Sequence, residues 1–214
     1  MTTTHLKHFR LITLVAFAAV AAIAGGRATT ASAAGTCSLP TASPSLLSLG
    51  DPNWYFLAPG GDFESAANGW SLSGGAGVVA GNETSYVGSK TDSHSLALPT
   101  TSASVTTPTF CVTTLAPTFR MFIKNNGGQG HIDGQLAVYL NYTDANNKPQ
   151  QVKIAALTVN STAWTLSQPI SFIQYLSTPL RAQGLANISF TIKPNDNHGN
   201  WQIDDMYVDP FLAR

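Results

Sequence analysis

The chain has 214 residues, and its 11 basic and 11 acidic residues give a formal net charge of zero. Only 10% of the residues are charged, 43% are hydrophobic, and the basic residues form no run. This composition lacks the electrostatic footprint of a nucleic-acid-binding protein. We therefore expect no nucleic-acid partner.

Residues 1–33 have the three parts of a secretory signal peptide. A basic start with Lys7 and Arg10 precedes an apolar run at residues 11–24, and Ala31-Ser32-Ala33 supplies an A-x-A cleavage site. Because three basic residues and no acidic one lie in this segment, the remaining 181 residues carry a formal charge of −3. We predict that the mature chain is secreted and extracellular.

Two kinds of membrane attachment are the alternatives to cleavage. A transmembrane anchor needs about 20 apolar residues, whereas Gly25 and Gly26 end this run after 14 residues. A lipid anchor on Cys37 needs a small residue before the cysteine, where Thr36 stands. No later segment is long and apolar enough to cross a bilayer, so we expect no membrane span after signal cleavage.

Residues 34–50 are a polar, proline-containing leader, and we predict that residues 51–214 form one domain. Cys37 in the leader and Cys111 in the domain are the only cysteines of the sequence. In an oxidising compartment an even number of cysteines indicates a disulfide, so we predict a bridge between them. Two free or metal-binding thiols are the alternative. The chain-entropy model gives a loop of this length about 4–5 kcal/mol.

Every second residue is hydrophobic along three stretches, at 119–124, 136–142 and 188–192. A period of two indicates strands with one buried face. Shorter candidate strands are Trp70–Ser73, Val78–Ala80, Ser95–Leu98, Val105–Val112, Val152–Thr158, Ala163–Ser167 and Gln202–Val208. Only Pro169–Gln183 has room for a helical turn. This pattern predicts an all-β fold, a two-sheet antiparallel β-sandwich of jelly-roll type.

Sugar hydrolysis usually needs a pair of carboxylates, and the sequence offers no suitable pair. Asp204 and Asp205 are adjacent on a predicted strand, so their side chains should point to opposite faces of the sheet. Two carboxylates that act on one glycosidic bond must face each other across it. We therefore predict that the chain is not an enzyme and has no catalytic residues.

Acidic residues at the two ends of the domain suggest a cation site. Glu64 follows Gly60-Gly61-Asp62-Phe63, and Asp204 and Asp205 lie in the last predicted strand. First and last strands are often neighbours in a sandwich, and Ca²⁺ takes six to eight oxygen ligands. The alternative is that these carboxylates cap loops or pair with Arg120 or a lysine.

The opening Gly60-Gly61-Asp62-Phe63-Glu64, with Gly69-Trp70, and the closing Ile203-Asp204-Asp205 resemble the jelly-roll carbohydrate-binding modules of xylanases and other glycanases. These modules belong to the galactose-binding-like group, and the sequence is most similar to secreted actinobacterial members. The resemblance implies a structural Ca²⁺ on the Glu64 carboxylate, the Asp62 carbonyl and one of the two aspartates. It also implies that Trp70 belongs to the core.

The partner that the resemblance implies is a polysaccharide or a cell-surface glycan. Such modules stack aromatic rings on sugar faces and hydrogen-bond the hydroxyl groups. The candidate ligand-binding residues are Arg120, Tyr139, Asn141, Trp164 and Trp201. We expect a monomer. The alternative function is a secreted structural or interaction protein that keeps the fold without binding sugar.

Overall fold

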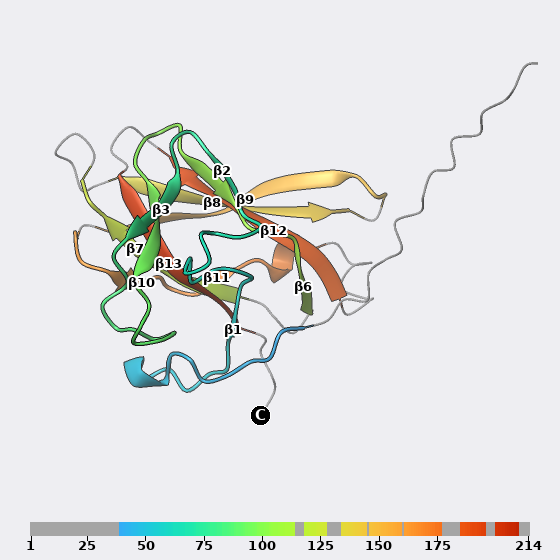
Figure 1. The fold of residues 1–214 in the computed structure, drawn as a ribbon. Helices are drawn as coiled ribbons and strands as arrows, with labels where there is room; N and C mark the ends of the chain where they lie inside the picture. The colour runs from blue at the N-terminus through green and yellow to red at the C-terminus, as the bar shows by residue number, and fades with distance from the viewer. Residues whose placement is uncertain are drawn as a thin grey trace, which may run out of the picture. The chain divides into compact units, whose positions relative to one another are not determined.

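Two antiparallel sheets face each other in the computed structural model, which describes residues 39–113, 118–127, 134–144, 146–159, 161–176, 185–195 and 200–209 (Figure 1). The chain divides into residues 1–33 and 34–214, and all described residues belong to the second part. The predicted signal peptide and Cys37 therefore lie outside the described residues, whereas Cys111 is buried. The predicted disulfide stays a prediction.

Among the described residues, seven strands form the first sheet, in the order β10-β7-β13-β4-β3, with β1 paired to β13 and β11 paired to β7. Their bounds are β1 (Phe56–Leu57), β3 (Gly77–Ala80), β4 (His94–Leu98), β7 (Thr118–Asn125), β10 (Thr165–Leu166), β11 (Ile170–Ser171) and β13 (Trp201–Asp209). The first strand β1 and the last strand β13 are neighbours, which brings the two ends of the domain together.

Six described strands form the second sheet, in the order β2-β5-β12-β8-β9, with β6 paired to β12. Their bounds are β2 (Ser71–Ser73), β5 (Ser104–Thr106), β6 (Phe110–Thr113), β8 (Gln135–Thr143), β9 (Pro149–Thr158) and β12 (Leu185–Pro194). Two short 3₁₀ turns complete the described elements, η1 (Leu47–Leu49) and η2 (Ile173–Tyr175). The predicted β-sandwich of jelly-roll type is confirmed.

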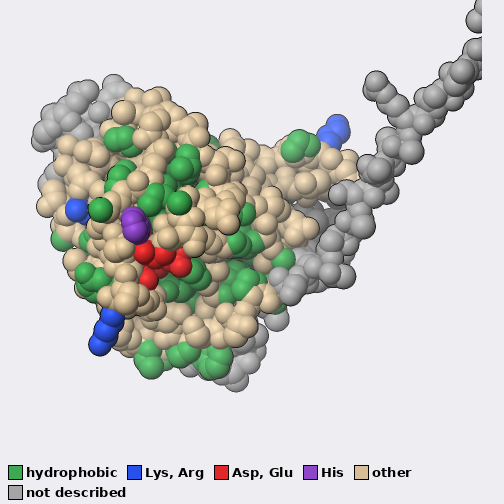
Figure 2. Space-filling model, viewed as in Figure 1, with side chains coloured by type: hydrophobic (Ala, Val, Ile, Leu, Met, Phe, Trp, Pro, Cys, Tyr) green, Lys and Arg blue, Asp and Glu red, His purple; other side chains and the backbone are tan. Residues whose placement is uncertain are grey.

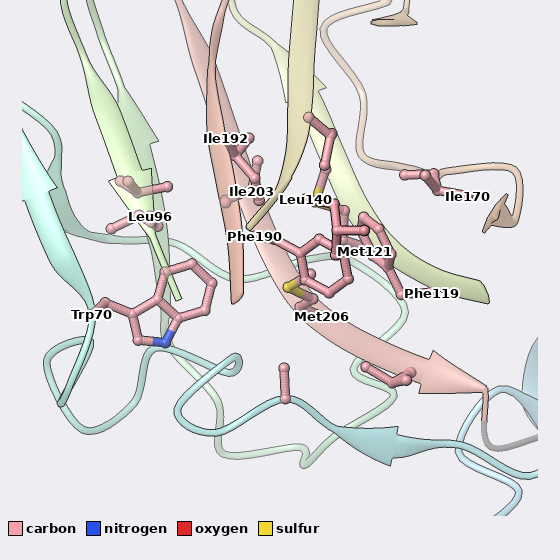
Figure 3. Close-up of a cluster of buried hydrophobic side chains, with 14 of the residues drawn as sticks. Trp70, Leu96, Phe119, Met121, Leu140, Ile170, Phe190, Ile192, Ile203 and Met206 are labelled. Carbon is pink, nitrogen blue, oxygen red and sulfur yellow. The ribbon is translucent and has the colours of Figure 1, made fainter. Parts of the chain in front are cut away.

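The inner faces of the two sheets make the core (Figure 3). Phe119, Met121 and Ile123 of β7 are buried there, as their alternation predicted. Trp70 also packs in this core, and its indole N–H donates to the Pro59 carbonyl at 2.8 Å. The predicted strand Val105–Val112 divides into β5 and β6, and Pro108, which has no N–H to donate, lies at the division.

Residues 39–55, which we name the strap, cover part of the outer face of the seven-stranded sheet. Leu46 and Tyr55 of the strap pack against Phe122 and Tyr207 of the sheet, and all four side chains are buried. The described part of the predicted polar leader therefore packs on the domain. Among the described residues, no helix is long and apolar enough to span a membrane.

An ion pair fastens the strap to the sheet. Asp51 Oδ2 accepts hydrogen bonds from Arg120 Nη1 at 2.8 Å and from the Tyr55 hydroxyl at 2.7 Å. The Arg120 and Asp51 side chains are only 15% and 18% exposed. Arg120 Nε also donates to the Ser167 carbonyl at 2.9 Å, so this guanidinium links three segments of the chain.

We expect Asp51→Asn to lower the free energy of unfolding by about 1–3 kcal/mol, because it leaves a largely buried guanidinium without its charged partner. Urea unfolding followed by fluorescence measures this change. Asn53→Ala, on an exposed strap residue, is the matched control. An unchanged urea midpoint in Asp51→Asn would show that the ion pair does not fasten the strap.

Candidate functional site

A β-bulge in β13 shapes the acidic end of the domain. The register between β13 and β7 shifts between Asp204 and Tyr207, and Asp205 has a φ of 45°. Simple alternation would place the Asp204 and Asp205 side chains on opposite faces of the sheet, but a bulge re-aims side chains. Both carboxylates reach the segment 83–88: Asp204 accepts from the Glu83 N–H, and Asp205 Oδ1 lies beside Gly88, 3.4 Å from a Cβ built there. The predicted opposite placement was therefore wrong.

The Asp204 carboxylate is fully engaged by the backbone. One oxygen accepts from the Glu83 N–H at 2.9 Å and the other from the Asp205 N–H at 2.9 Å. Burial raises the pKa of Asp204 to about 8 despite these hydrogen bonds, and the Asp205 charge adds to the rise. Asp204 thus holds the loop to the last strand.

Glu83 is fully buried, and sequence reasoning missed it. Its carboxylate accepts from the Ser85 N–H at 2.5 Å and from the Val87 N–H at 2.7 Å. Residues 83–87 thereby form a turn that this one carboxylate stabilises. No periodic pattern marks a loop glutamate, so only the buried partners reveal this role.

Two carboxylates converge beside Gly88. A Cβ built on Gly88 would lie 2.7 Å from Asp92 Oδ2 and 3.4 Å from Asp205 Oδ1. Asp205 is 1% exposed, and its Oδ2 atom is buried with no hydrogen-bond partner among the described residues. An orphaned buried carboxylate oxygen beside a second carboxylate is an arrangement that a bound cation would satisfy.

The electrostatics agree with this geometry. Burial and the charges of Glu83, Asp92 and Asp62 raise the pKa of Asp205 to about 7. Burial and the charges of Glu64 and Asp62 also raise the pKa of Asp92. We name Asp62, Glu64, Glu83, Asp92 and Asp205 the acidic cluster. Figure 2 shows acidic side chains gathered beside a histidine on one face of the molecule.

Glu64, the carboxylate predicted to bind calcium, has partners on β4. Its Oε1 atom accepts from the backbone N–H groups of Ser93 and His94, at 2.8 and 2.6 Å. Its Oε2 atom lies 3.0 Å from His94 Nδ1. The structure thus places Glu64 at the rim of the acidic cluster and ties it to the start of β4.

The four predicted metal residues divide into two groups. Asp62, Glu64 and Asp205 belong to the acidic cluster, whereas the two oxygens of Asp204 accept from the backbone N–H groups of Glu83 and Asp205. Within the described part of the chain, no three His, Cys, Asp or Glu side chains already converge as a metal site. Any cation there would also need backbone carbonyl or water oxygens.

The predicted ligand-binding residues also divide. Tyr139 and Asn141 lie on the outer face of the six-stranded sheet, where Tyr139 stands opposite Thr191 and Thr191 opposite Thr106. Asn141 Nδ2 donates to Thr191 Oγ1 at 2.9 Å, and Thr191 Oγ1 lies 2.8 Å from Thr106 Oγ1. Lys193 Nζ lies 4.7 Å from the centre of the Tyr139 ring.

The other three candidates belong to the seven-stranded sheet or its neighbourhood. Trp201 is fully buried in the core, so its proposed role as a stacking platform is wrong. Arg120 holds Asp51 of the strap. Trp164 is partly buried and packs against the cluster of Leu46, Tyr55, Phe122 and Tyr207. Lys124 Nζ lies 5.7 Å from the centre of its ring. These side chains do not lie on the sheet face that Tyr139 and Asn141 share.

Two hollows adjoin these regions. One, of about 360 Å³, contains Asn141 and is lined by neutral side chains of β8, β9 and β12 with Thr109. The other, of about 750 Å³, lies between the strap and residues 85–92 and includes Asp62 and Asp92. Both regions can therefore receive a ligand group.

No protein-family model matches the sequence, and no curated protein is similar to it. Among solved structures, the chain is similar to a xylan-binding domain of carbohydrate-binding module family 22, with 14% identity and a TM-score of 0.45 over 77% of this chain and 99% of that one. A xylan-binding family 22 domain from Paenibacillus barcinonensis has 14% identity and a TM-score of 0.44 over 70% and 90% of the two chains.

A further similar structure is a family 61 carbohydrate-binding module in complex with β-1,4-galactotriose. It has 19% identity and a TM-score of 0.37 over 70% of this chain and 94% of that one. The resemblance to carbohydrate-binding modules that the end motifs predicted is thus found again among solved structures, as a likeness of fold.

Proposed function

We propose that the chain is a secreted, non-catalytic module that binds a polysaccharide or cell-surface glycan on the outer face of the six-stranded sheet, with a structural Ca²⁺ in the acidic cluster. The polar row across that sheet carries the proposal. Lys153, Tyr139, Thr191, Thr106 and Ser71 stand opposite one another on β9, β8, β12, β5 and β2.

The chemistry of this row suits sugar hydroxyl groups. Each Ser or Thr hydroxyl can donate one hydrogen bond and accept two, and an amide can do both. Asn141 stands beside the row, and Gln151 Nε2 donates to Asn141 Oδ1 at 2.7 Å. The adjoining hollow of about 360 Å³ has no charged side chain in its lining. The hollow therefore favours a neutral part of a glycan, and Tyr139 is the aromatic ring in the row, with Lys193 Nζ 4.7 Å from its centre.

The residues of the acidic cluster fit a calcium ion. Asp205 and Asp92 offer hard oxygen ligands beside Gly88, where the absence of a Cβ leaves the space between them open. The orphaned Asp205 Oδ2 would gain a partner, and calcium would offset the burial and the repulsion that together raise the pKa of Asp205. Asp62 and Glu64 are close enough to add negative charge. Extracellular calcium would therefore stabilise this end of the domain.

The engagement of the acidic side chains supports a non-catalytic role. Asp204, Glu83 and Glu64 each use both carboxylate oxygens on neighbouring groups, most of them backbone N–H groups. Acids of a glycosidase must instead be available to a glycosidic bond and to water. These carboxylates act as structural ties.

We expect Asn141→Ala to weaken the binding of a neutral polysaccharide about tenfold, because one lost hydrogen-bonding side chain costs about 1–1.5 kcal/mol. Affinity electrophoresis in gels that contain xylan or β-1,4-galactan measures the change, and calorimetry with matching oligosaccharides gives its size. Asn53→Ala on the strap is the matched control and should bind like the wild type. Equal retention of the two variants would contradict a site at Asn141.

One observation favours the alternative function, a secreted structural or interaction protein. The Asn141 amide already hydrogen-bonds Thr191, Ser189 and Gln151, so the polar row is satisfied without a glycan. If the wild type is not retained by any polysaccharide in the panel, the alternative replaces the glycan-binding proposal.

A further inference from the structure

The larger hollow has a mixed lining that the sheet face does not share. Its volume is about 750 Å³, and its walls come from the strap, from residues 85–92 and from Tyr207. Hydroxyl groups of Ser43, Ser45, Ser85 and Ser89 line it together with three tyrosine side chains. An open hollow with aromatic rings and many hydroxyl groups has the composition of a sugar-binding site.

Tyr86 is the exposed ring of this hollow. Its side chain is 47% exposed, whereas Tyr55 and Tyr207 in the same lining are buried. Its φ of 48° is a left-handed conformation that a bulky residue rarely adopts, and such strain persists only where the surroundings impose it. The loop therefore presents this ring to solvent at a backbone cost.

The Glu83 carboxylate holds the loop in that conformation. Its carboxylate accepts from the N–H groups of Ser85 and Val87, the residues on either side of Tyr86. The Glu83 N–H is in turn bonded to Asp204 of β13. The ring is thus carried at the tip of a loop that is closed around a fully buried carboxylate and fastened to the sheet.

We propose that this hollow is a second carbohydrate subsite, in which Tyr86 stacks on the face of a neutral sugar ring. The proposal rests on the proposed function for its ligand class, but it places the contact at different residues. Asp62, Asp92 and Lys90 line the same hollow, and the five carboxylates of the acidic cluster outnumber the charges of Lys90 and of a bound Ca²⁺, so a sugar carboxylate would be repelled. The structure therefore assigns to this subsite neutral sugars rather than uronates.

The strap takes part in this subsite. Thr41, Ser43, Ser45 and Ser48 form one wall of the hollow, and buried Leu46 between them anchors that wall on the sheet. The subsite is therefore built jointly by the strap and the domain, and it depends on the strap being docked.

The test compares three variants on neutral xylan, on β-1,4-galactan and on polygalacturonate. Tyr86→Ala should weaken binding to the retained neutral polysaccharide five- to tenfold, because it removes the ring. Tyr86→Phe keeps the ring and should stay within twofold of the wild type. Trp54→Ala removes a ring that is 46% exposed on the strap but does not line the hollow, and it should bind like the wild type.

Asn141→Ala in the same series separates the two proposals. If Asn141→Ala weakens binding and Tyr86→Ala matches Trp54→Ala, the second subsite is wrong and the sheet site stands. If Tyr86→Ala alone weakens binding, the subsite stands and the sheet site is wrong. Retention of polygalacturonate in preference to neutral polymers would overturn the ligand class, and retention of no polymer would overturn both sites.

A double-mutant comparison tests Glu83 as the positioning residue. Glu83→Gln should weaken glycan binding in the wild-type background, because an amide has a single acceptor oxygen for the two N–H groups. In the Tyr86→Ala background the same change should add no further loss of affinity. An equal loss in both backgrounds would show that Glu83 acts on stability alone and does not position Tyr86.

Discussion

Chelation of calcium is expected to lower the melting temperature of the secreted chain. A ligand at 100 times its dissociation constant stabilises the folded state by about 2.7 kcal/mol. For a domain of this size each 1 kcal/mol corresponds to about 2–4 °C, so we expect EDTA to lower the melting temperature by about 5–10 °C. Differential scanning calorimetry in millimolar calcium and in EDTA measures the difference.

Asp205→Asn distinguishes the calcium site from an ordinary destabilising mutation, because calcium should decide whether the variant melts below or above the wild type. In calcium the variant should melt below the wild type, because it lacks a charged ligand. In EDTA it should melt at or above the wild type, because the wild type then keeps a carboxylate that is 1% exposed and repelled by Glu83, Asp92 and Asp62. The order of the two proteins should thus reverse when calcium is removed.

Asp144→Asn is the control for a loop aspartate outside the acidic cluster. Asp144 accepts hydrogen bonds from the Asn146 and Lys148 N–H groups, so its variant should lose the same stability in calcium and in EDTA. Gly88→Ala should abolish the calcium response, since the added Cβ would lie 2.7 Å from Asp92 Oδ2. A wild type whose melting temperature ignores EDTA would exclude the calcium site.

The sequence predicts the fold well where hydrophobic and other residues alternate along a strand. Successive side chains of a strand point to opposite faces, so Phe119, Met121 and Ile123 could be assigned to the core from spacing alone. The same rule also left a signal unused. Phe122 on the other face of β7 is buried. Its burial requires a segment that covers it, and Leu46, Leu47 and Leu49 in the polar leader did not identify that segment.

The site was harder to predict because loops and a bulge build it. The bulge after Asp204 breaks the alternation on which the placement of Asp205 depended. Glu83 and Asp92 lie in polar loops without periodicity, so nothing in their spacing marks them as members of the acidic cluster. The prediction that Trp201 is an exposed stacking platform was wrong for a related reason. The exposure of an aromatic side chain at the end of a strand depends on which residues pack over it, and the sequence does not show them.

Phe190→Ala is expected to have the largest effect on stability of any change considered. Phe190 is fully buried in the core beside Phe119 (Figure 3). Its ring centre lies 4.3 Å from that of Phe119 and 5.4 Å from that of Phe172. Truncation of a buried phenylalanine costs about 3–5 kcal/mol, and a whole domain has only about 5–15 kcal/mol. Urea unfolding should show a much lower midpoint.

The next residue of the same strand separates fold from function. Thr191 points to the outer face, where its hydroxyl meets Asn141 and Thr106, so Thr191→Ala should cost only about 1 kcal/mol of stability. Its glycan affinity should nevertheless fall, whereas the folded fraction of Phe190→Ala should keep its affinity. If the adjacent variants instead lose stability and affinity in equal proportion, the polar row serves the fold of β12 and the glycan site lies elsewhere.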